Sequence, residues 1–322
     1  PAGPGLEQDN PYVPGQLNLR AQALQLGGRT LNKLVAGLSR EGSTWRASLD
    51  AEQLSGYAEL RPGRPGNPGR VYARMARLAV PRSDADDLDQ LMDQHPRSVP
   101  TLDIVIDDFE LRGLRLGRLE VQAQQQAEAR EWRLSKLQLK NPDATLSVTG
   151  QWAPAAGQGA RRTELDWRME VADAGKLLER LGQGQVLRNG KGVLAGKLDW
   201  SGSPLSPDYA SMNGALNLQI DAGQFLKAEP GVGRLLGVLS LQSLPRRLVL
   251  DFRDLFSQGF AFDGFAGDIR IAQGVAHSDN LKMRGLQAVV LMEGQADLAR
   301  ETQDLHVLVV PEINAGGAAL AY

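Results

Sequence analysis

The stretch TLDIVIDDFEL, residues 101–111, shows the pattern that decides the fold. Leu102, Ile104 and Ile106 recur at every second position, so in an extended chain their side chains point to one face. Similar alternation returns in RLEVQAQ, ATLSVTGQW, VLAGKLDW, ALNLQID, RLVLDF and LHVLVV. Such stretches favour strands with one apolar and one polar face. The chain is therefore predicted to be mainly β.

Composition excludes several classes of function. The chain has 322 residues, with 36 Lys and Arg against 38 Asp and Glu, and the absence of a basic stripe argues against nucleic-acid binding. It has no cysteine, which excludes disulfides, a thiolate nucleophile and cysteine-ligated zinc. Its opening, PAGPGLEQDNPYVPG, has neither the basic nor the apolar region of a signal peptide. We therefore expect an internal piece of a longer protein.

Helical spacing occurs in four places only, namely residues 28–40, 84–95, 173–182 and 231–244. Asp84 and Asp173 are predicted to cap the second and third of these helices. The fourth contains Leu235, Leu236 and Leu239, which we expect either to gate a groove or to pack as core. Helices this few and this short are not expected to cover a large sheet.

An internal repeat organises the strands. Seven residues match seven others at a constant offset of 144: Leu137, Leu139, Ala144, Leu146, Val148, Gly150 and Gln151 match Leu281, Met283, Ala288, Val290, Met292, Gly294 and Gln295. Upstream, FELRGL (109–114) is aligned with FAFDGF (260–265), and LEV (119–121) with IRI (269–271). Gly113 and Gly264 are expected at a bend or bulge. Three continuous regions are predicted: an entry segment with a short helix (1–44), a first β-repeat region (45–160) and a second with helices (161–322).

The apolar face of such a sheet needs a cover. About a dozen strands are expected, and open sheets beyond about ten strands curl. Two outcomes remain: a closed sandwich or barrel with a dry core, or a long curved, twisted antiparallel sheet that forms a hydrophobic groove. Serial repeats favour the groove, because stacked units contact only their neighbours. Its aliphatic lining would suit acyl chains better than rings or sugars.

The predicted lining combines the apolar alternating positions of the clearest strands. It consists of Leu102, Ile104, Ile106, Leu146, Val148, Leu216, Leu218, Ile220, Leu248, Leu250, Phe260, Phe262, Ile269, Ile271, Leu305, Val307 and Val309. Each of these residues would contact either lipid or the protein core.

Other chemistry finds little support in the sequence. The acidic pairs Asp107–Asp108 and Asp251–Asp254 would suit acid–base catalysis, but their positions at strand ends favour solvated carboxylates. The three histidines, His95, His277 and His306, share no ligand spacing, so no metal site is predicted. Five arginines in loops would meet lipid phosphates at a groove mouth or remain solvated: Arg61, Arg64, Arg70, Arg246 and Arg247.

Two stretches, GRLLGVLSLQSLPRRLVLDFRDLFSQGF (233–260) and DLARETQDLHVLVVPEINAGGAALAY (297–322), give the chain a resemblance to the bacterial AsmA-like family. The resemblance extends from about Trp45 to Ala318. It implies a periplasmic protein that is anchored in the inner membrane by an N-terminal helix and reaches toward the outer membrane. It also implies that phospholipid is conducted along a hydrophobic β groove, with neither cofactor nor enzymatic activity. The alternative hypotheses are a closed β-sandwich that docks an envelope partner and an envelope hydrolase.

Overall fold

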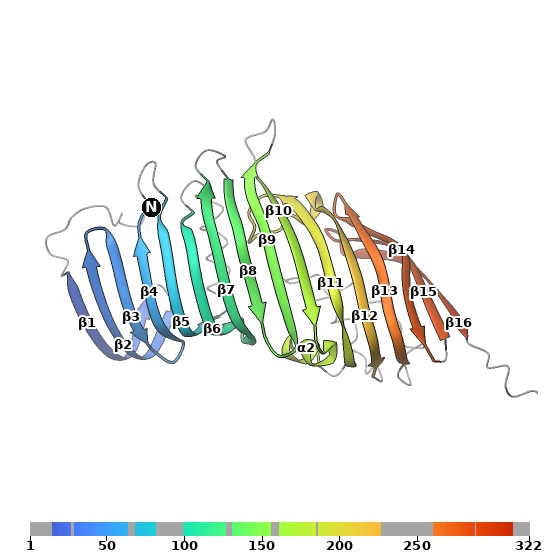
Figure 1. Cartoon of the computed structure of the whole chain (residues 1–322), viewed down its shortest axis with the longest axis horizontal. Coiled ribbons are helices and arrows are strands. Elements are labelled where there is room, and N and C mark those ends of the chain that lie inside the picture. Colours follow the sequence, from blue (N-terminus) through green and yellow to red (C-terminus); the bar gives the residue numbers. More distant parts are fainter. Residues whose placement is uncertain are drawn as a thin grey trace, which may run out of the picture.

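In the computed structural model the chain forms one sheet of sixteen strands, which follow one another in sequence order (Figure 1). The structure describes residues 15–26, 29–63, 68–81, 99–126, 131–155, 161–184, 186–226, 260–286 and 288–311. The prediction of a mainly β chain built from serial strands is confirmed. Within these residues the sheet is open, because β1 and β16 are its two ends and do not pair with each other.

The strands have seven to fifteen residues. They are β1 (Gln16–Leu26), β2 (Arg29–Glu41), β3 (Thr44–Asp50), β4 (Leu54–Arg61), β5 (Arg70–Val80), β6 (Thr101–Leu111), β7 (Leu114–Gln126), β8 (Glu131–Lys140), β9 (Ala144–Pro154), β10 (Arg161–Val171), β11 (Leu187–Ser201), β12 (Asn213–Phe225), β13 (Phe260–Ala272), β14 (Val275–Gly285), β15 (Ala288–Asp297) and β16 (Thr302–Pro311). Helix α2 (Ala174–Arg180) and the 3-10 turn η1 (Tyr209–Ser211) complete the described elements.

One pair of strands departs from the predicted antiparallel arrangement. Strands β5 and β6 run parallel, with Ala73 opposite Ile104, whereas the other neighbouring pairs are antiparallel. A parallel pair requires a long crossover, because the chain must return to the end of the sheet from which it left. About twenty residues separate Val80 from Thr101, which is long enough for such a crossover.

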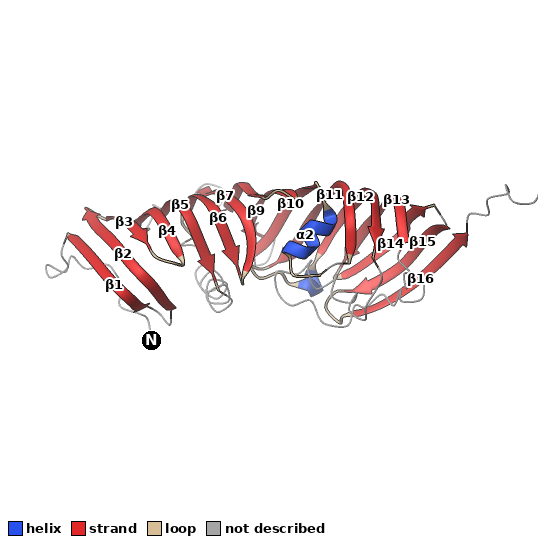
Figure 2. Cartoon of the chain, turned by 90° about the horizontal axis from the view of Figure 1, so that it is seen from below, coloured by secondary structure: helices blue, strands red, loops and turns tan. Residues whose placement is uncertain are grey.

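The sheet is curved, and α2 lies on its concave side (Figure 2). No second sheet faces it among the described residues, so the closed sandwich or barrel is wrong for this part of the chain. Curvature is the physical alternative to a second sheet, since a twisted sheet of this width curls. None of the helices in the described ranges has the length and the apolar composition needed to cross a bilayer.

The helix predictions have mixed outcomes. Helix α2 and its cap are confirmed, because the Asp173 side chain accepts a hydrogen bond from the Lys176 N–H at 3.0 Å. The helix predicted over residues 28–40 is wrong, because this segment is strand β2. The segments 84–95 and 231–244 lie outside the described residues, and so do the proposed gating residues Leu235, Leu236 and Leu239.

The repeat at an offset of 144 is confirmed in its second half. Leu137 of β8 pairs with Val148 of β9, and Leu281 of β14 pairs with Met292 of β15. In both hairpins the register shifts at the same place, between positions 134 and 137 in one and between positions 278 and 281 in the other. The two hairpins therefore share register and bulge. The division at residues 44 and 160 remains a prediction, and the sheet continues from β9 into β10 without a break.

The upstream half of the repeat alignment is wrong. Arg112 and Gly113 form the turn between β6 and β7, whereas Asp263 and Gly264 lie within β13, at a bulge. The segments LEV (119–121) and IRI (269–271) also occupy different places, because they lie opposite non-equivalent parts of β8 and β14. Short alternating segments resemble one another, and only the strand register separates true from accidental matches.

Candidate functional site

A continuous row of apolar residues crosses thirteen strands on one face of the sheet. Each member lies directly opposite the next on the neighbouring strand, so all of their side chains share this face. The row runs Leu17, Leu38, Ala47, Ala58, Ala73, Ile104, Val121, Leu137, Val148, Trp167, Gly196, Leu216 and Ile269. We call the face that bears it the apolar face and the opposite one the polar face.

The apolar face is the concave one. Ala174 and Leu178 of α2 pack against a buried cluster that contains Ile220 of the apolar face. Because α2 lies on the concave side of the sheet in Figure 2, the side chains of the apolar face point into the curve. The sheet thus presents hydrocarbon along its inner surface.

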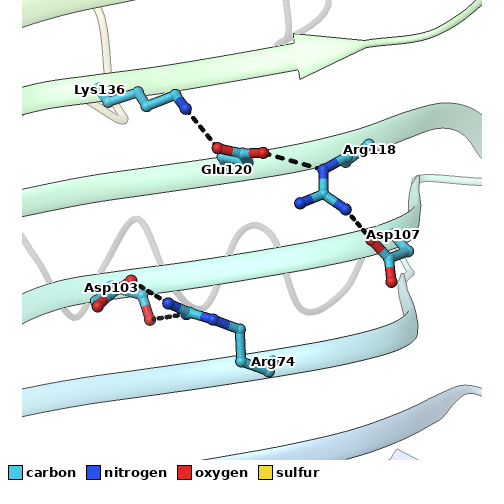
Figure 3. A network of polar contacts seen from close by, with 6 residues as sticks. All are labelled: Arg74, Asp103, Asp107, Arg118, Glu120 and Lys136. Atoms are coloured by element: carbon cyan, nitrogen blue, oxygen red, sulfur yellow. Dashed lines mark hydrogen bonds and ion pairs between the residues drawn. The ribbon is translucent and has the colours of Figure 1, made fainter.

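The polar face carries cross-strand ion pairs (Figure 3). Arg74 of β5 reaches Asp103 of β6, with 2.8 Å between its Nη2 and Oδ1. Glu120 of β7 accepts from Lys136 at 2.5 Å and from Arg118 at 3.0 Å, and Arg118 also pairs with Asp107. The convex side is therefore an ordinary hydrated surface, on which side chains of opposite charge form ion pairs between neighbouring strands.

Two carboxylates on the polar face have lowered pKa values for different reasons. Hydrogen bonds from Lys136 and Arg118 lower the pKa of Glu120 below its ordinary 4.5. Hydrogen bonds from the amides of Asn217 and Asn280 lower the pKa of Asp268 below 3.8. The two Asn side chains come from β12 and β14, on either side of β13. Both carboxylates stay ionised at neutral pH and have structural partners.

The structure brings most of the predicted lining residues together on the apolar face. The fifteen that it describes share this face through strand register and alternation: Leu102, Ile104, Ile106, Leu146, Val148, Leu216, Leu218, Ile220, Phe260, Phe262, Ile269, Ile271, Leu305, Val307 and Val309. Leu248 and Leu250 lie outside the described residues. Contact of any of these side chains with lipid remains a prediction.

A bulge puts the phenylalanines of β13 on the apolar face. Phe262 pairs with Gly285 and Phe265 pairs with Met283, so the register shifts between them and Gly264 lies at the bulge, as predicted. The shift lets even-numbered Phe260 and Phe262 point to the same side as the odd-numbered positions that follow them. These rings, with the 5.6 Å Phe225–Phe262 pair, form the buried cluster beside α2.

The apolar face is incompletely covered along its length, and Leu17 in the first strand and Val307 in the last are 44% and 39% exposed. Leu146, Val148, Leu216, Leu218 and Ile269 are only half-buried. By contrast, fully buried residues gather in separate clusters, such as the one around Val290 near the C-terminal end of the sheet. The half-buried stretch therefore leaves apolar surface in contact with solvent.

Three tryptophans, which the sequence reasoning did not single out, lie along one rim of the apolar face. Trp132 donates to the Pro100 carbonyl at 3.3 Å, and Trp200 donates to the Ser203 carbonyl at 2.8 Å. Trp152 pairs with Trp132 across β8 and β9. Its ring lies 4.4 Å from the Arg161 guanidinium, whose pKa is lowered by burial. Indoles suit the boundary between hydrocarbon and water. The sequence signal that could have indicated these rim residues is a tryptophan near one end of a stretch of alternating apolar residues.

Helix α2 closes part of the opposite rim. Arg180 in its last turn donates from Nε to Asp143 Oδ2 at 2.7 Å, and Asp143 is only 5% exposed. Arg180 also reaches the Arg115 carbonyl of β7, at 3.3 Å. The helix thus joins β11, on which it packs, to the turn between β8 and β9 and to β7.

The parts of the chain that the structure describes contain no arrangement of side chains typical of a catalytic site or a metal site. Asp107 is ion-paired with Arg118 on the polar face, and the Asp251–Asp254 pair lies outside the described residues. His277 and His306 are on different, non-neighbouring strands, and His95 is not described. No cluster of three His, Asp or Glu within these ranges is arranged to hold a metal ion.

Comparison with known proteins supplies the family. The model of the YhdP protein family matches residues 3–321. The chain belongs to the YhdP family. The intermembrane phospholipid transporter YhdP of Escherichia coli strain K12 is 32% identical over 179 residues. That match covers 55% of this chain and 14% of the transporter, so the chain spans a small part of this relative's length. Comparison with solved structures gave no significant match.

Proposed function

We propose that this chain is a segment of a bridge that binds the acyl chains of phospholipid on its apolar face and conducts phospholipid between the inner and outer membranes. It acts without enzymatic chemistry, in the periplasm of a Gram-negative bacterium. Other parts of the protein anchor it in the inner membrane and contact the outer membrane. The observation that carries the proposal is the apolar row across thirteen strands on a concave surface. The E. coli relative is named an intermembrane phospholipid transporter, which supports the choice of phospholipid as cargo.

The energetics require a continuous track. Burial of a methylene contributes about 0.8 kcal/mol, so a sixteen-carbon chain that leaves a bilayer needs roughly 12 kcal/mol of replacement contacts. Isolated apolar patches would leave the chain in water between them. The row from Leu17 to Ile269 has no charged member, and every strand except β11, where Gly196 stands, offers a moving acyl chain an apolar side chain.

The length of the track suits a conduit better than a single pocket. Twelve strand spacings of about 4.8 Å give roughly 58 Å, which is about twice the 30 Å hydrocarbon core of a bilayer. The half-buried side chains in the middle, such as Val148 and Leu218, leave this path accessible from the concave side. An open side also lets the polar headgroup stay in water while the acyl chains move.

Photocrosslinking tests the proposal directly. A photoreactive residue at Leu218 or Phe262 is expected to crosslink to phospholipid in cells, and mass spectrometry should recover phospholipid from the purified chain. The matched control is Gln219, which is adjacent to Leu218 but points to the polar face. Equal crosslinking from positions 218 and 219, or no crosslinking from 218 and 262, would refute lipid binding on the apolar face.

A further inference from the structure

A polar hollow lies on the other side of the sheet, at the rim where β4, β5, β6, β7 and β8 meet. It encloses about 400 Å³, within the range of small-ligand sites. Its polar lining comes from two adjacent rows and a neighbouring residue of β8: Arg61, Arg70, Thr101, Asp103, Gln122, Gln124 and Ser135. Pro68, Leu102 and Ala123 complete the lining. The row register places its polar side chains on the polar face, away from the proposed lipid track.

The local register explains why a hollow forms here. Gln122 pairs with Lys136 but Ala123 pairs with Leu134, so Ser135 is an extra residue in β8. The Ser135 hydroxyl turns to the Gln122 carbonyl at 3.0 Å. A bulge bends its strand and re-aims neighbouring side chains, which opens the surface between β7 and β8.

Two arginines face each other in this hollow without a matching pair of carboxylates. Arg61 of β4 lies directly opposite Arg70 of β5, and like charges in that position destabilise a sheet. Arg61 has no ion-pair or hydrogen-bond partner among the described residues. Arg70 makes a long ion pair with Asp103, with 3.9 Å between Nη2 and Oδ2, and its guanidinium lies 5.9 Å from the centre of the Tyr72 ring. The other oxygen of Asp103 is bound by Arg74 at 2.8 Å. The protein thus leaves positive charge uncompensated at this rim.

The neutral groups of the hollow complete an oxyanion site. The side chains of Thr101, Gln122 and Gln124 have no hydrogen-bond partners in the part of the chain that the structure describes, and each offers a donor. Guanidinium groups bind phosphate with paired, charge-assisted hydrogen bonds. We propose that the hollow binds the phosphate of a small phosphorylated polyol, either free in solution or as a phosphoglycerol headgroup.

Binding of sn-glycerol 3-phosphate to the 322-residue chain tests the site by calorimetry at low ionic strength. One molecule per chain is expected to bind, and glycerol without phosphate is not. Arg61→Gln and Arg70→Gln should each weaken the affinity at least tenfold. Arg20→Gln, which removes a charge from the polar face of β1, should change it less than twofold. Absence of saturable binding, or an equal effect of Arg20→Gln and Arg61→Gln, overturns the proposal.

Two further measurements separate folding effects and the source of the phosphate. Arg61→Gln relieves a like-charge pair, so the ligand-free thermal midpoint should stay equal or rise; a fall would show a structural role for Arg61 instead. Short-chain phosphatidylglycerol should bind with the same dependence on Arg61, and glycerol phosphate should displace it. If glycerol phosphate does not displace the bound lipid, and Arg61→Gln does not change the affinity for the lipid, then the phosphate in the hollow does not come from a lipid headgroup. Crosslinking from Leu218 should be unaffected by Arg61→Gln, so this test is independent of the lipid track.

Discussion

Gly150 of β9 lies directly opposite Leu165 of β10, and the Leu165 Cδ2 atom is 2.7 Å from where a Cβ on residue 150 would stand. The same relationship joins Gly196 to Leu216, at 2.8 Å. A leucine thus folds over a glycine of the next strand on the concave face. Absence of a side chain on one partner lets the neighbouring strand close in, which favours curvature toward this face.

Replacement of Gly150 by Ala is expected to destabilise the sheet. Its Cβ would lie 2.2 Å from the Glu164 carbonyl oxygen, so the backbones of β9 and β10 would have to separate. Overpacking of this kind costs about 1–3 kcal/mol. The urea midpoint measures the loss. Gly264→Ala is the control, because nothing lies within 4 Å of its Cβ position. Equal midpoints for the two variants would contradict the role given to the glycine.

A charge in the middle of the apolar face should block lipid with little unfolding. Leu218 is half-buried, so an aspartate there remains hydrated, and Leu218→Asp is expected to reduce copurified phospholipid several-fold. Val290 on the same face is 0% exposed, and Val290→Asp should cost at least 3 kcal/mol, because the carboxylate has no route to water. Lipid recovery and thermal midpoints measure the two effects.

The control for the Leu218→Asp and Val290→Asp variants is a substitution on the polar face. Gln219→Asp adds the same charge on the polar face and should leave both lipid recovery and stability unchanged. If Leu218→Asp unfolds the chain as Val290→Asp does, position 218 belongs to an ordinary protein core. The hypothesis of an exposed lipid path on the apolar face would then be wrong. A Leu218→Asp variant that keeps its stability and its full phospholipid content would also argue against the track.

Glu120 and Asp268 should respond differently to salt. The cations Lys136 and Arg118 hold down the pKa of Glu120, whereas neutral amides dominate at Asp268. Salt screens exposed charges, so at about 1 M salt the Glu120 pKa should rise toward 4.5 and the Asp268 pKa should change less. NMR titration of the two carboxyl groups measures both. Since both pKa values are lowered by folding, their stabilising contribution is complete above pH 4.5 and disappears as the pH falls through the folded-state pKa values.

Lys136→Gln provides the matched control. It removes the ammonium that donates to Glu120, so the pKa of that carboxyl should rise at low salt and lose part of its salt dependence. Asp268 should be unaffected, because its partners are Asn217 and Asn280. A Glu120 pKa that Lys136→Gln leaves unchanged would assign the shift to another cause.

Strand β2 shows why periodicity alone misled the sequence prediction. Leu31 and Leu34 are three residues apart, which is helical spacing, yet both pack in one cluster on the sheet. Lys33 between them has a positive φ of 53°, and the pairing with β1 is interrupted there without a change of register, because Ala21 pairs with Leu34 and Ala23 with Asn32. The left-handed backbone at Lys33 interrupts the regular alternation of the strand, so residues three apart share a face and the strand imitates the pattern of a helix. Nothing in the amino-acid sequence around Lys33 marks it as the position with an irregular backbone.

Other features were readable because they depend on alternation alone. Leu102, Ile104 and Ile106 follow a strict period of two, and the structure places them on one face. The parallel pairing of β5 with β6 was not predictable, since it depends on the path of the crossover. The Arg61–Arg70 pair was also invisible as a pair, because a strand register, not a sequence motif, puts the two residues opposite each other.

The ion pair that holds α2 at the rim should be asymmetric in its energetics. Arg180→Leu leaves the buried Asp143 carboxylate without its guanidinium, and removal of one partner of a buried pair costs about 3 kcal/mol. Hydrogen exchange of the amides in residues 174–182 should accelerate accordingly. The double variant Asp143→Asn/Arg180→Leu removes the stranded charge and should recover most of the protection. Lys176→Leu, at an exposed position of the same helix, should have little effect. Equal exchange in the single and double variants would show that the desolvated carboxylate is not what holds α2 in place.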